Sequence, residues 1–516
     1  MAFERGIMLT TTSLRVGCNY HSLEQLDLRL PFWCYASSLK DEDYFFLLDS
    51  ARDPGKLGKY SFIGGNPSLV FRAKRQRTTA SGLGAAIEVV EYQSRADNAP
   101  RSKAAVSRWI GDPFEALRRL LAERRVEYAE YQAHPVRFLS GAVGYIGYEA
   151  GYFIEALPDL GVDDLGLPDM YFMFTDSVLA HCNQTGHSYL SVVGRGDNES
   201  SARQAAITIR DQWMRRIATL EASADPELLQ VPQKNGGPKK IQIRAHFDEA
   251  SYARAVRTIK EHIFAGDAYE VCFTHRLETP LTGDPWSLYR ELRRINPAPF
   301  AAYLSLPDAY IISSSPERFL RLDSDGIAES RPIKGTRPRG QTPAQDSGLC
   351  RELSTSIKDR AENMMIVDLV RNDFGKVSLF GTVHVPELMT IEPYATVFQM
   401  VSTIRGELNR ESDGIDLIKA CFPGGSMTGA PKIEAMKIID RLEPVKRGVY
   451  SGSIGYIDFS GCMDLNIVIR TIVVKDGCCY LNAGGAIVAD SDPIGEYAEA
   501  MDKARALIAA IKSLNR

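Results

Sequence analysis

The segment that most constrains how this chain folds is Val231 to Lys240, which reads VPQKNGGPKK. Prolines, glycines and lysines at this density cannot fill a hydrophobic core, so the segment is predicted to be a surface connection. The chain has 516 residues, and a chain of this length forms about two or three domains of ordinary size. We therefore expect an N-terminal region, residues 1–230, and a C-terminal region, residues 241–516.

The hydrophobic pattern is unlike that of a Rossmann fold or a barrel. Alternating apolar residues predict strands at Tyr60–Ile63, Phe138–Ile146, His187–Val193, Ala301–Leu306, Ala309–Ser313, Ser453–Ile457, Leu465–Val474 and Cys479–Ala483. Helical periodicity predicts helices at Phe114–Arg125, Ser200–Ala222, Phe247–Phe264, Ala361–Leu369, Ile415–Cys421, Lys432–Arg441 and Tyr497–Ser513. Because these elements are mixed without strict βαβ alternation, we predict an α+β fold built as a layered sandwich.

Charge and composition exclude several functional classes. The chain carries 61 basic and 65 acidic residues, a net charge of −4, so no overall field attracts nucleic acid or membranes. Residues 1–20 lack the apolar core of a signal peptide, and no long uncharged apolar run follows. The nine cysteines are scattered and lack C-x-x-C spacing, which is typical of reduced thiols. We expect a cytoplasmic protein that binds neither nucleic acid nor a membrane.

One basic segment is Arg331 to Gly340, RPIKGTRPRG. Its prolines and glycines disfavour both a helix and a strand interior, so the residues predict a fixed loop dense in positive charge. Such a loop suits an anionic ligand. The alternative interpretation is a solvated basic loop without a ligand.

A glycine-rich segment, Phe422 to Lys432 (FPGGSMTGAPK), precedes a predicted helix. Glycine-rich turns at a helix start present free backbone N–H groups, which favour a carboxylate or a phosphate. Ala430 follows Gly429 where a Walker A loop requires Lys, so a small carboxylated ligand fits better than a nucleotide. A purely structural turn is the alternative.

Three glutamates suggest a cation site. Glu496 and Glu499 are three residues apart in a predicted helix and therefore share one face. A hard cation between them would relieve the repulsion of two like charges, and Glu362 in another predicted helix could be a third oxygen donor. The alternative is an ordinary solvated helix surface.

Together these segments resemble the chorismate-utilising enzymes, the family of anthranilate synthase component I and aminodeoxychorismate synthase component I. The resemblance runs in order from about Ala245 to the C-terminus through SPERFL at Ser315, PIKGTRPRG at Pro332, AENMMIVDLVRND at Ala361, FPGGSMTGAPK at Phe422, GVYSGSIGY at Gly448, NIVIRT at Asn466 and NAGGAIVADSDPIGEYAEAMDKA at Asn482. Weaker matches in the N-terminal region are FLLDSA at Phe46, KYSFIGG at Lys59 and SGAVGYIGYE at Ser140. The resemblance implies two mostly antiparallel sheets flanked by helices, with the active site in the C-terminal region.

The resemblance also implies roles for individual residues. Glu317 matches the general acid that protonates the departing 4-hydroxyl of chorismate, and a hydroxide leaves poorly without a proton. Residues that match positions around the substrate are Thr428, Gly429, Tyr450, Arg470, Gly485 and Lys503. Residues that match ligands of Mg²⁺ are Glu362, Glu496 and Glu499.

Lys334 selects one reaction within the family. Anthranilate synthases usually show Ala at this position (PIAGT), whereas aminodeoxychorismate synthases show the Lys of PIKGT. A desolvated lysine flanked by Arg331, Arg337 and Arg339 is expected to have a lowered pKa and a neutral amine that can attack carbon. In that family the amine adds at C2 as the 4-hydroxyl departs, and ammonia then enters at C4. The alternative role for Lys334 is a simple counter-ion for a carboxylate.

These residues imply an aminodeoxychorismate synthase component I that makes 4-amino-4-deoxychorismate for p-aminobenzoate and folate. Alternatives are an anthranilate synthase component I of tryptophan synthesis and a non-catalytic paralogue that binds chorismate or tryptophan. The chain has no G-x-C-x-G-x-Q nucleophile motif, so ammonia is expected from a partner glutamine amidotransferase or from solution.

The chain departs from the family's pattern at several positions. Gln399 stands where relatives carry the His of HLVST, so pyruvate elimination loses its usual imidazole. Glu270 stands where glutamine-dependent relatives often have Gln and water-adding relatives have Lys, which argues against water as the nucleophile. The segment NPAPFAAYL, Asn296 to Leu304, lacks the Met of the tryptophan-feedback motif, which weakens the case for regulation by tryptophan.

Overall fold

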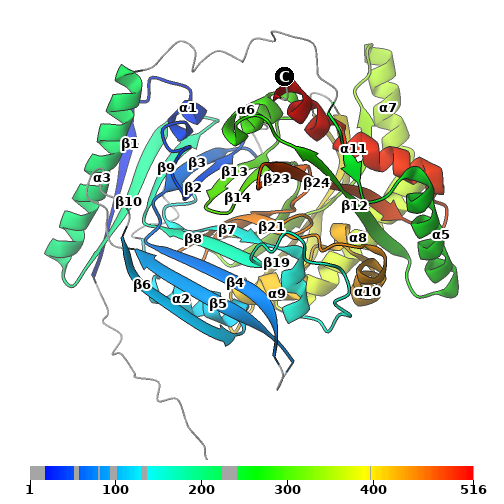
Figure 1. The fold of residues 1–516 in the computed structure, drawn as a ribbon, viewed down its shortest axis with the longest axis horizontal. Coiled ribbons are helices and arrows are strands. Elements are labelled where there is room, and N and C mark those ends of the chain that lie inside the picture. The colour runs from blue at the N-terminus through cyan, green and yellow to red at the C-terminus, as the bar shows by residue number, and fades with distance from the viewer. Residues whose placement is uncertain are drawn as a thin grey trace, which may run out of the picture.

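The computed structural model describes residues 18–51, 57–78, 82–92, 102–128, 136–223, 241–394 and 397–514. The predicted connection Val231 to Lys240 lies outside these ranges. In the described residues, the strands form two sheets of twelve strands each, and neighbouring strands within both sheets pair antiparallel. This arrangement, flanked by helices (Figure 1), confirms the predicted α+β layered fold.

The first sheet carries strands from both predicted regions. In spatial order they are β1 (Cys18–Leu26), β10 (Ser188–Gly196), β9 (Ser177–Cys182), β3 (Tyr60–Gly65), β2 (Phe45–Asp49), β13 (Phe300–Leu306), β14 (Ala309–Ser315), β23 (Thr471–Lys475), β24 (Cys478–Ile487), β12 (Glu270–Pro280) and β11 (Arg244–Ala245). The short β20 (Gly429–Ala430) also pairs with β12. The two regions join where β2 pairs with β13, with Leu47 opposite Tyr303.

The second sheet is built in the same way. In spatial order its strands are β17 (Ile333–Pro338), β19 (Val397–Glu407), β16 (Ile327–Arg331), β15 (Arg318–Leu322), β22 (Met463–Asn466), β21 (Ser453–Asp458), β7 (Gly141–Ile146), β8 (Met170–Thr175), β4 (Leu69–Thr78), β5 (Gly82–Tyr92) and β6 (Lys103–Gly111). The strand β18 (His384–Pro393) pairs with β19. The two regions join again where β21 pairs with β7, with Tyr456 opposite Val143.

The helices cover the outer parts of the sheets. They are α1 (Phe32–Ala36), α2 (Pro113–Glu123), α3 (Glu199–Ala222), α5 (Glu249–Ala265), α6 (Pro285–Ile295), α7 (Pro343–Thr355), α8 (Ile357–Gly375), α9 (Gly414–Cys421), α10 (Lys432–Leu442) and α11 (Pro493–Leu514), with 3₁₀ turns η2 (Tyr148–Phe153) and η3 (Gly425–Met427). In Figure 1, α3 lies along β1 and β10 at one end of the molecule, while α5, α7, α10 and α11 lie at the other. Thus the helices that carry the family motifs gather at one end.

Local sequence explains where several helices begin. The side chains of Asp112, Asp248 and Asp284 accept backbone N–H groups at the starts of α2, α5 and α6. Such caps satisfy donors that have no partner inside the helix. The helix α5 ends at Gly266, whose φ of 85° lies in the left-handed region that glycine adopts without strain. Each predicted helix is present, but α8 (Ile357–Gly375) extends well beyond the predicted Ala361–Leu369 at both ends.

Two predictions of strand structure were wrong. The predicted strand Leu465–Val474 is interrupted between β22 and β23, and Arg470 in the break has a left-handed φ of 50°. The predicted loop Arg331 to Gly340 contains β17, which pairs with β19 with a register shift between Ile333 and Thr336. Gly335 sits within this shift at φ 86°, and an edge strand tolerates the flanking prolines.

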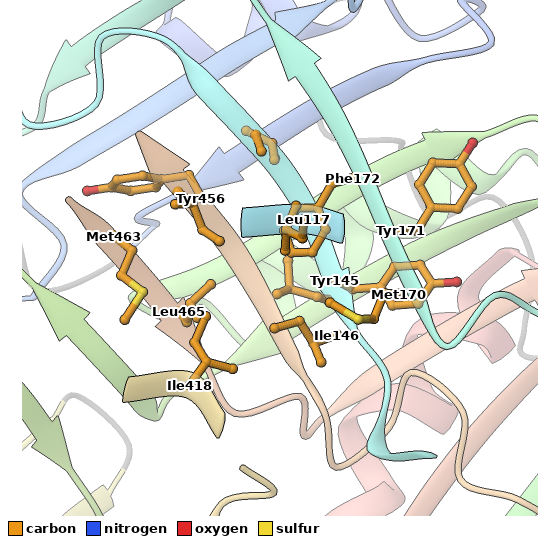
Figure 2. Packing of buried hydrophobic residues seen from close by; sticks show 14 of the residues in the cluster. Leu117, Tyr145, Ile146, Met170, Tyr171, Phe172, Ile418, Tyr456, Met463 and Leu465 are labelled. Carbon is orange, nitrogen blue, oxygen red and sulfur yellow. The ribbon is translucent and has the colours of Figure 1, made fainter. Parts of the chain in front are cut away.

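A continuous hydrophobic core joins the two regions. Figure 2 shows Leu117 of α2 and Ile418 of α9 near β7, β8, β21 and β22, whose side chains Tyr145, Phe172 and Leu465 belong to the same buried cluster. Burial of apolar surface at about 25 cal/mol per Å² is the main stabilising contribution in such a core. No helix in the described part of the chain is long and apolar enough to span a membrane.

Candidate active site

The predicted lysine and the unusual glutamate meet between the two sheets. Lys334 on β17 donates a hydrogen bond from Nζ to Oε1 of Glu270, at the start of β12, over 2.7 Å. Oε2 of Glu362 on α8 lies 4.0 Å from the same nitrogen. Glu270 is fully buried and Lys334 is 9% exposed. The structure thus places the candidate nucleophile inside the protein and in contact with a carboxylate.

The expected lowering of the Lys334 pKa was wrong. Burial alone would lower the pKa, but the charges of Glu270 and Glu362 more than offset burial and raise it above its ordinary value. Lys334 therefore rests as a cation. Its two carboxylate partners come from distant segments, so the local composition of RPIKGTRPRG could not reveal them.

Each of the arginines that flank Lys334 forms an ion pair with at least one carboxylate of the protein. Arg331 pairs with Glu387 and Glu392, Arg337 with Glu352 and Asp359, and Arg339 with Asp346, at N–O distances between 2.6 and 3.0 Å. These pairs fix the segment in place and leave little unbalanced charge. The positive charge predicted for this fixed loop is therefore largely balanced by carboxylates of the protein itself.

The segment Phe422 to Lys432 forms a tight lining beside β12. Gly429 has φ 136°, and a Cβ there would lie 2.0 Å from the carbonyl oxygen of Glu270, so only glycine fits. The Thr428 hydroxyl donates to the carbonyl oxygens of Gly424 and Gly425, 3.2 and 3.3 Å away. Thr428 is fully buried and its side chain holds the turn together. The glycine at 429 thus lets this turn approach β12 closely, and the Thr428 hydroxyl is used within the turn.

Glu317 and Arg470 form a second polar group in the site. Glu317 is 5% exposed, and burial is the main cause that raises its pKa to about 7, against the opposing effects of Ser426, Lys334 and Arg470. Burial lowers the pKa of the Arg470 guanidinium, and Glu317 counteracts this. Among the described residues, no carboxylate lies within ion-pair distance of Arg470. An unpaired guanidinium beside a carboxyl group that is partly protonated at neutral pH suits an anionic ligand.

The carboxylates of α11 converge beside Gly485 of β24. A Cβ at Gly485 would lie 3.1 Å from Oε2 of Glu496, 3.3 Å from Nζ of Lys503 and 3.8 Å from Oε1 of Glu499. The Ser491 hydroxyl donates to Glu496 over 2.7 Å, while Lys503 pairs with Glu499 over 2.8 Å. Burial raises the pKa of Glu496; at Glu499 burial opposes the effect of Lys503, which prevails and lowers the pKa. Glycine at 485 keeps this space open.

The third predicted metal ligand faces lysines. Oε1 of Glu362 lies 3.9 Å from Nζ of Lys358, and burial is the main cause that raises the pKa of Glu362. Lys358 also interacts electrostatically with Glu496 and Glu499, which places all three glutamates around one lysine. Carboxylate oxygens are the type of ligand that a hard cation such as Mg²⁺ prefers, so the chemistry of these three side chains fits such a cation. Within the described ranges, however, no three ligating side chains are already gathered as a metal centre.

Residues that sequence reasoning missed hold these segments together. The Arg447 guanidinium is 1% exposed; it pairs with Glu443 and donates to the carbonyl oxygens of Met427 and Cys272, each over 2.7 Å. It thereby ties the glycine-rich turn to β12, next to Tyr450, which is 7% exposed. Glu149 accepts the backbone N–H groups of Arg447 and Gly448, both over 2.9 Å. Glu149 lies within the SGAVGYIGYE motif and Arg447 directly precedes GVYSGSIGY, but only the fold shows which atoms they contact.

Comparison with known proteins relates this arrangement to one family. A model described as chorismate binding enzyme matches residues 66–509. An aminodeoxychorismate synthase of Streptomyces pristinaespiralis is 41% identical over 473 residues, which are 90% of this chain and 62% of that protein. An anthranilate synthase component 1 of Acetivibrio thermocellus is 38% identical over 90% of both chains. The chain therefore spans less than two thirds of the Streptomyces relative but most of the anthranilate synthase component.

A solved structure has the same architecture. The crystal structure of anthranilate synthase component I from Streptococcus pneumoniae TIGR4 superposes with a TM-score of 0.70 and 27% sequence identity, over 87% of this chain and 92% of that one. The two large antiparallel sheets with flanking helices are therefore a shared fold. The similarity extends over both predicted regions.

Proposed function

The chain belongs to the chorismate binding enzyme family, and from this membership we propose that it acts as an aminodeoxychorismate synthase component I. It would convert chorismate and ammonia to 4-amino-4-deoxychorismate, a precursor of p-aminobenzoate and folate, in the cytoplasm. The observation that carries the proposal is Lys334, a buried amine in contact with Glu270 and close to Glu362. An amine at this position can form a covalent adduct with chorismate, which the Ala of anthranilate synthases cannot.

Binding of chorismate would use the charges that the protein leaves unbalanced. Arg470 has no ion pair within 4.0 Å among the described residues, and it suits the enolpyruvyl carboxylate together with the Tyr450 hydroxyl. The backbone amides of Gly429 and Gly485 would approach substrate carboxylates, and Gly485 leaves the space beside Glu496 and Lys503 free of a side chain. Lys503, which is half-exposed, would add a further positive charge at that end.

The first chemical step would form one bond and break another. Glu270 accepts a proton from Lys334 across their 2.7 Å hydrogen bond, and the neutral amine attacks C2 of chorismate. The ring double bonds shift, the C4–O bond breaks, and Glu317 gives its proton to the departing oxygen, which leaves as water. With a pKa of about 7, Glu317 keeps enough protonated form at neutral pH to act as this acid.

The second step would release the enzyme. Ammonia adds at C4, the double bonds shift back, and the C2–N bond to Lys334 breaks. Glu270 returns its proton to the freed lysine, and Glu317 regains a proton from the new ammonium group. The sum is chorismate plus ammonia to 4-amino-4-deoxychorismate plus water.

Mg²⁺ and an amidotransferase are the proposed cofactor and partner. Glu362, Glu496 and Glu499 would hold the cation, which when bound supplies positive charge for the ring carboxylate of chorismate. A glutamine amidotransferase subunit would supply ammonia. The designation of the Acetivibrio relative as component 1 supports an assembly with a second subunit.

The second candidate is anthranilate synthase component I. It is favoured by the Acetivibrio relative, which matches over 90% of both chains. Lys334 in place of Ala and Gln399 in place of His argue against it, because Gln399 offers no imidazole for pyruvate elimination. A non-catalytic paralogue that binds chorismate or tryptophan is the remaining alternative.

One assay separates these functions. The purified chain is incubated with chorismate, Mg²⁺ and ammonium, and the product is identified by chromatography and mass spectrometry. We expect 4-amino-4-deoxychorismate. Anthranilate as the main product would establish the second candidate instead. Binding of chorismate without turnover, even with a matched amidotransferase present, would indicate the non-catalytic paralogue.

A further inference from the structure

A side chain outside the predicted set contacts the candidate acid directly. The Ser426 hydroxyl donates to Oε1 of Glu317 over 3.0 Å. In the described part of the chain, this hydroxyl makes no other hydrogen bond. Ser426 is half-buried in η3, whereas Glu317 is almost fully buried. The contact therefore brings a neutral donor from the glycine-rich turn to one oxygen of the buried carboxyl group.

The turn that presents Ser426 is held on both sides. The Met427 backbone N–H donates to the carbonyl oxygen of Gly424 over 3.0 Å, and the Met427 carbonyl oxygen accepts from Arg447. A Cβ at Gly424 would lie 2.6 Å from Ile467, and one at Gly425 would lie 2.6 Å from Leu369. Glycine at these two positions lets the turn pack directly against Ile467 and Leu369. The position of the Ser426 hydroxyl is thus fixed by the fold.

A donor at Oε1 decides where the proton of Glu317 resides. Because the Ser426 hydroxyl donates to Oε1 and has no other acceptor among the described residues, the neutral carboxylic acid carries its proton on Oε2. The same hydrogen bond is stronger to the ionised carboxylate than to the neutral acid, so it favours loss of the proton. Burial acts in the opposite direction. Ser426 therefore both orients the acid and opposes the effect of burial.

The other charged groups around Glu317 are few. Lys334 and Arg470 face it, and both favour the ionised form. Arg318 and Asp373 line the same small cavity as Glu317 and Ser426. Arg318 is paired with Glu329 and Asp464, and Asp373 with Lys376 and Lys432, so their charges are balanced elsewhere. The neutral groups that hydrogen-bond to the acid are the Ser426 hydroxyl and the backbone of Ile333, and both favour the ionised form.

We propose that Ser426 is a positioning residue for Glu317, whose hydroxyl holds the carboxyl group by Oε1 and leaves Oε2 to deliver the proton to the departing oxygen of the substrate. This inference rests on the proposed function, because it assigns a proton donor to that reaction. It adds a residue that acts through Glu317 and does not itself contact the reacting atoms.

The first test measures the protonation of Glu317 without substrate. Infrared spectra of protein labelled with ¹³C at glutamate are recorded during a pH titration, and Glu317→Gln identifies the band of this residue. We expect Ser426→Ala to raise the pKa of Glu317 by about one unit, the scale of one charge-assisted hydrogen bond. Ser426→Thr keeps a hydroxyl and should restore the original titration. Ser223→Ala, at the exposed end of α3, is the control serine.

The second test uses the pH profile of turnover. A general acid must be protonated, so the rate falls as pH rises through the pKa of Glu317 near 7. In Ser426→Ala we expect kcat to fall about tenfold, which corresponds to the loss of one hydrogen bond. We also expect the alkaline limb of the pH–rate profile to move to higher pH. An unchanged titration and an unchanged alkaline limb in folded Ser426→Ala would overturn the role of Ser426. Absence of turnover in the wild-type chain would overturn the proposed function, while the infrared titration would still decide whether the Ser426 hydroxyl acts on the Glu317 carboxyl group.

Discussion

The two ends of the candidate site balance their charges in opposite ways. At the end formed by α8 and α11, each of Glu362 and Glu499 lies within ion-pair distance of a lysine. At the other end, in the described residues, Glu317 and Arg470 have no ion pair within 4.0 Å, and the Glu317 carboxyl group is hydrogen-bonded by the Ser426 hydroxyl and the Ile333 backbone. Both ends are polar, but only at the first end do charged side chains of the protein form ion pairs with one another.

This difference indicates which groups can exchange partners. A carboxylate paired with a half-exposed lysine, such as Glu499 with Lys503, gives up little when a divalent cation replaces the lysine, because exposed ion pairs contribute less than about 1 kcal/mol. The partly buried Arg470 guanidinium, which has no carboxylate within ion-pair distance, by contrast gains a partner when an anion binds. The first end is therefore suited to a cation and the second to the anionic substrate.

Lys334 links the two ends, and its removal should have the largest effect. We expect Lys334→Ala to lower formation of 4-amino-4-deoxychorismate at low ammonia by more than about a hundredfold, because loss of a covalent route exceeds loss of one charged hydrogen bond at about 1.5–3 kcal/mol. The measurement is the initial rate of product formation. Mass spectrometry of the wild-type peptide that contains Lys334 should detect a chorismate-derived adduct.

The control for this change must keep Glu270 paired. Lys334→Ala leaves a fully buried carboxylate without its partner, which destabilises a protein by about 3–5 kcal/mol. Lys334→Arg keeps the positive charge but offers no neutral nucleophile near pH 7, so it should be folded and inactive. Full activity in either variant, or a residual rate that ignores ammonia, would mean that Lys334 serves only as a counter-ion.

Glu499→Gln tests the lysine-balanced end and should have an intermediate effect. Loss of one anionic oxygen donor should weaken the apparent affinities for Mg²⁺ and for chorismate together, each by about tenfold, because the cation anchors the ligand. Isothermal titration with Mg²⁺ alone and steady-state kinetics measure the two affinities. Asp502→Asn, an exposed carboxylate on the same helix, is the matched control. Unchanged Mg²⁺ dependence would assign Glu499 to the solvated helix surface.

Periodicity predicted most elements because each strand and helix buries one side. The α+β class and the positions of the helices followed from apolar spacing alone. The break at Ile467 to Arg470 did not, because Ile467 and Val468 are both buried and continue the apolar run. The left-handed φ of Arg470 is also not marked by a glycine. The edge strand β17 was missed because its pairing partner β19 lies far along the chain.

The site shows a similar limit. Resemblance supplied the candidate residues, and the structure brings Lys334, Glu362 and Glu270 together. The ion pairs that balance the charge of the basic segment Arg331 to Gly340 could not be predicted from its sequence. The reason is that their carboxylates come from other elements, α7, α8, β12 and β18. Ser426 lies within the quoted FPGGSMTGAPK motif, but only the folded turn shows that its hydroxyl reaches Glu317. The roles of the metal ligands and substrate contacts stay predictions.

The smallest expected effect concerns a paired arginine of the basic segment. Arg337 pairs with Glu352 and Asp359 and its side chain is 26% exposed, so Arg337→Gln should cost only about 0.2–1 kcal/mol of stability. Its KM for chorismate should change less than about twofold, because its charge is already balanced within the protein. The same substitution at unpaired Arg470 should lower kcat/KM by about 10–100-fold, the scale of one charged hydrogen bond. Thermal unfolding and steady-state kinetics of the two variants measure this contrast. Equal losses of kcat/KM in both would mean that pairing within the protein does not decide which cation binds the substrate.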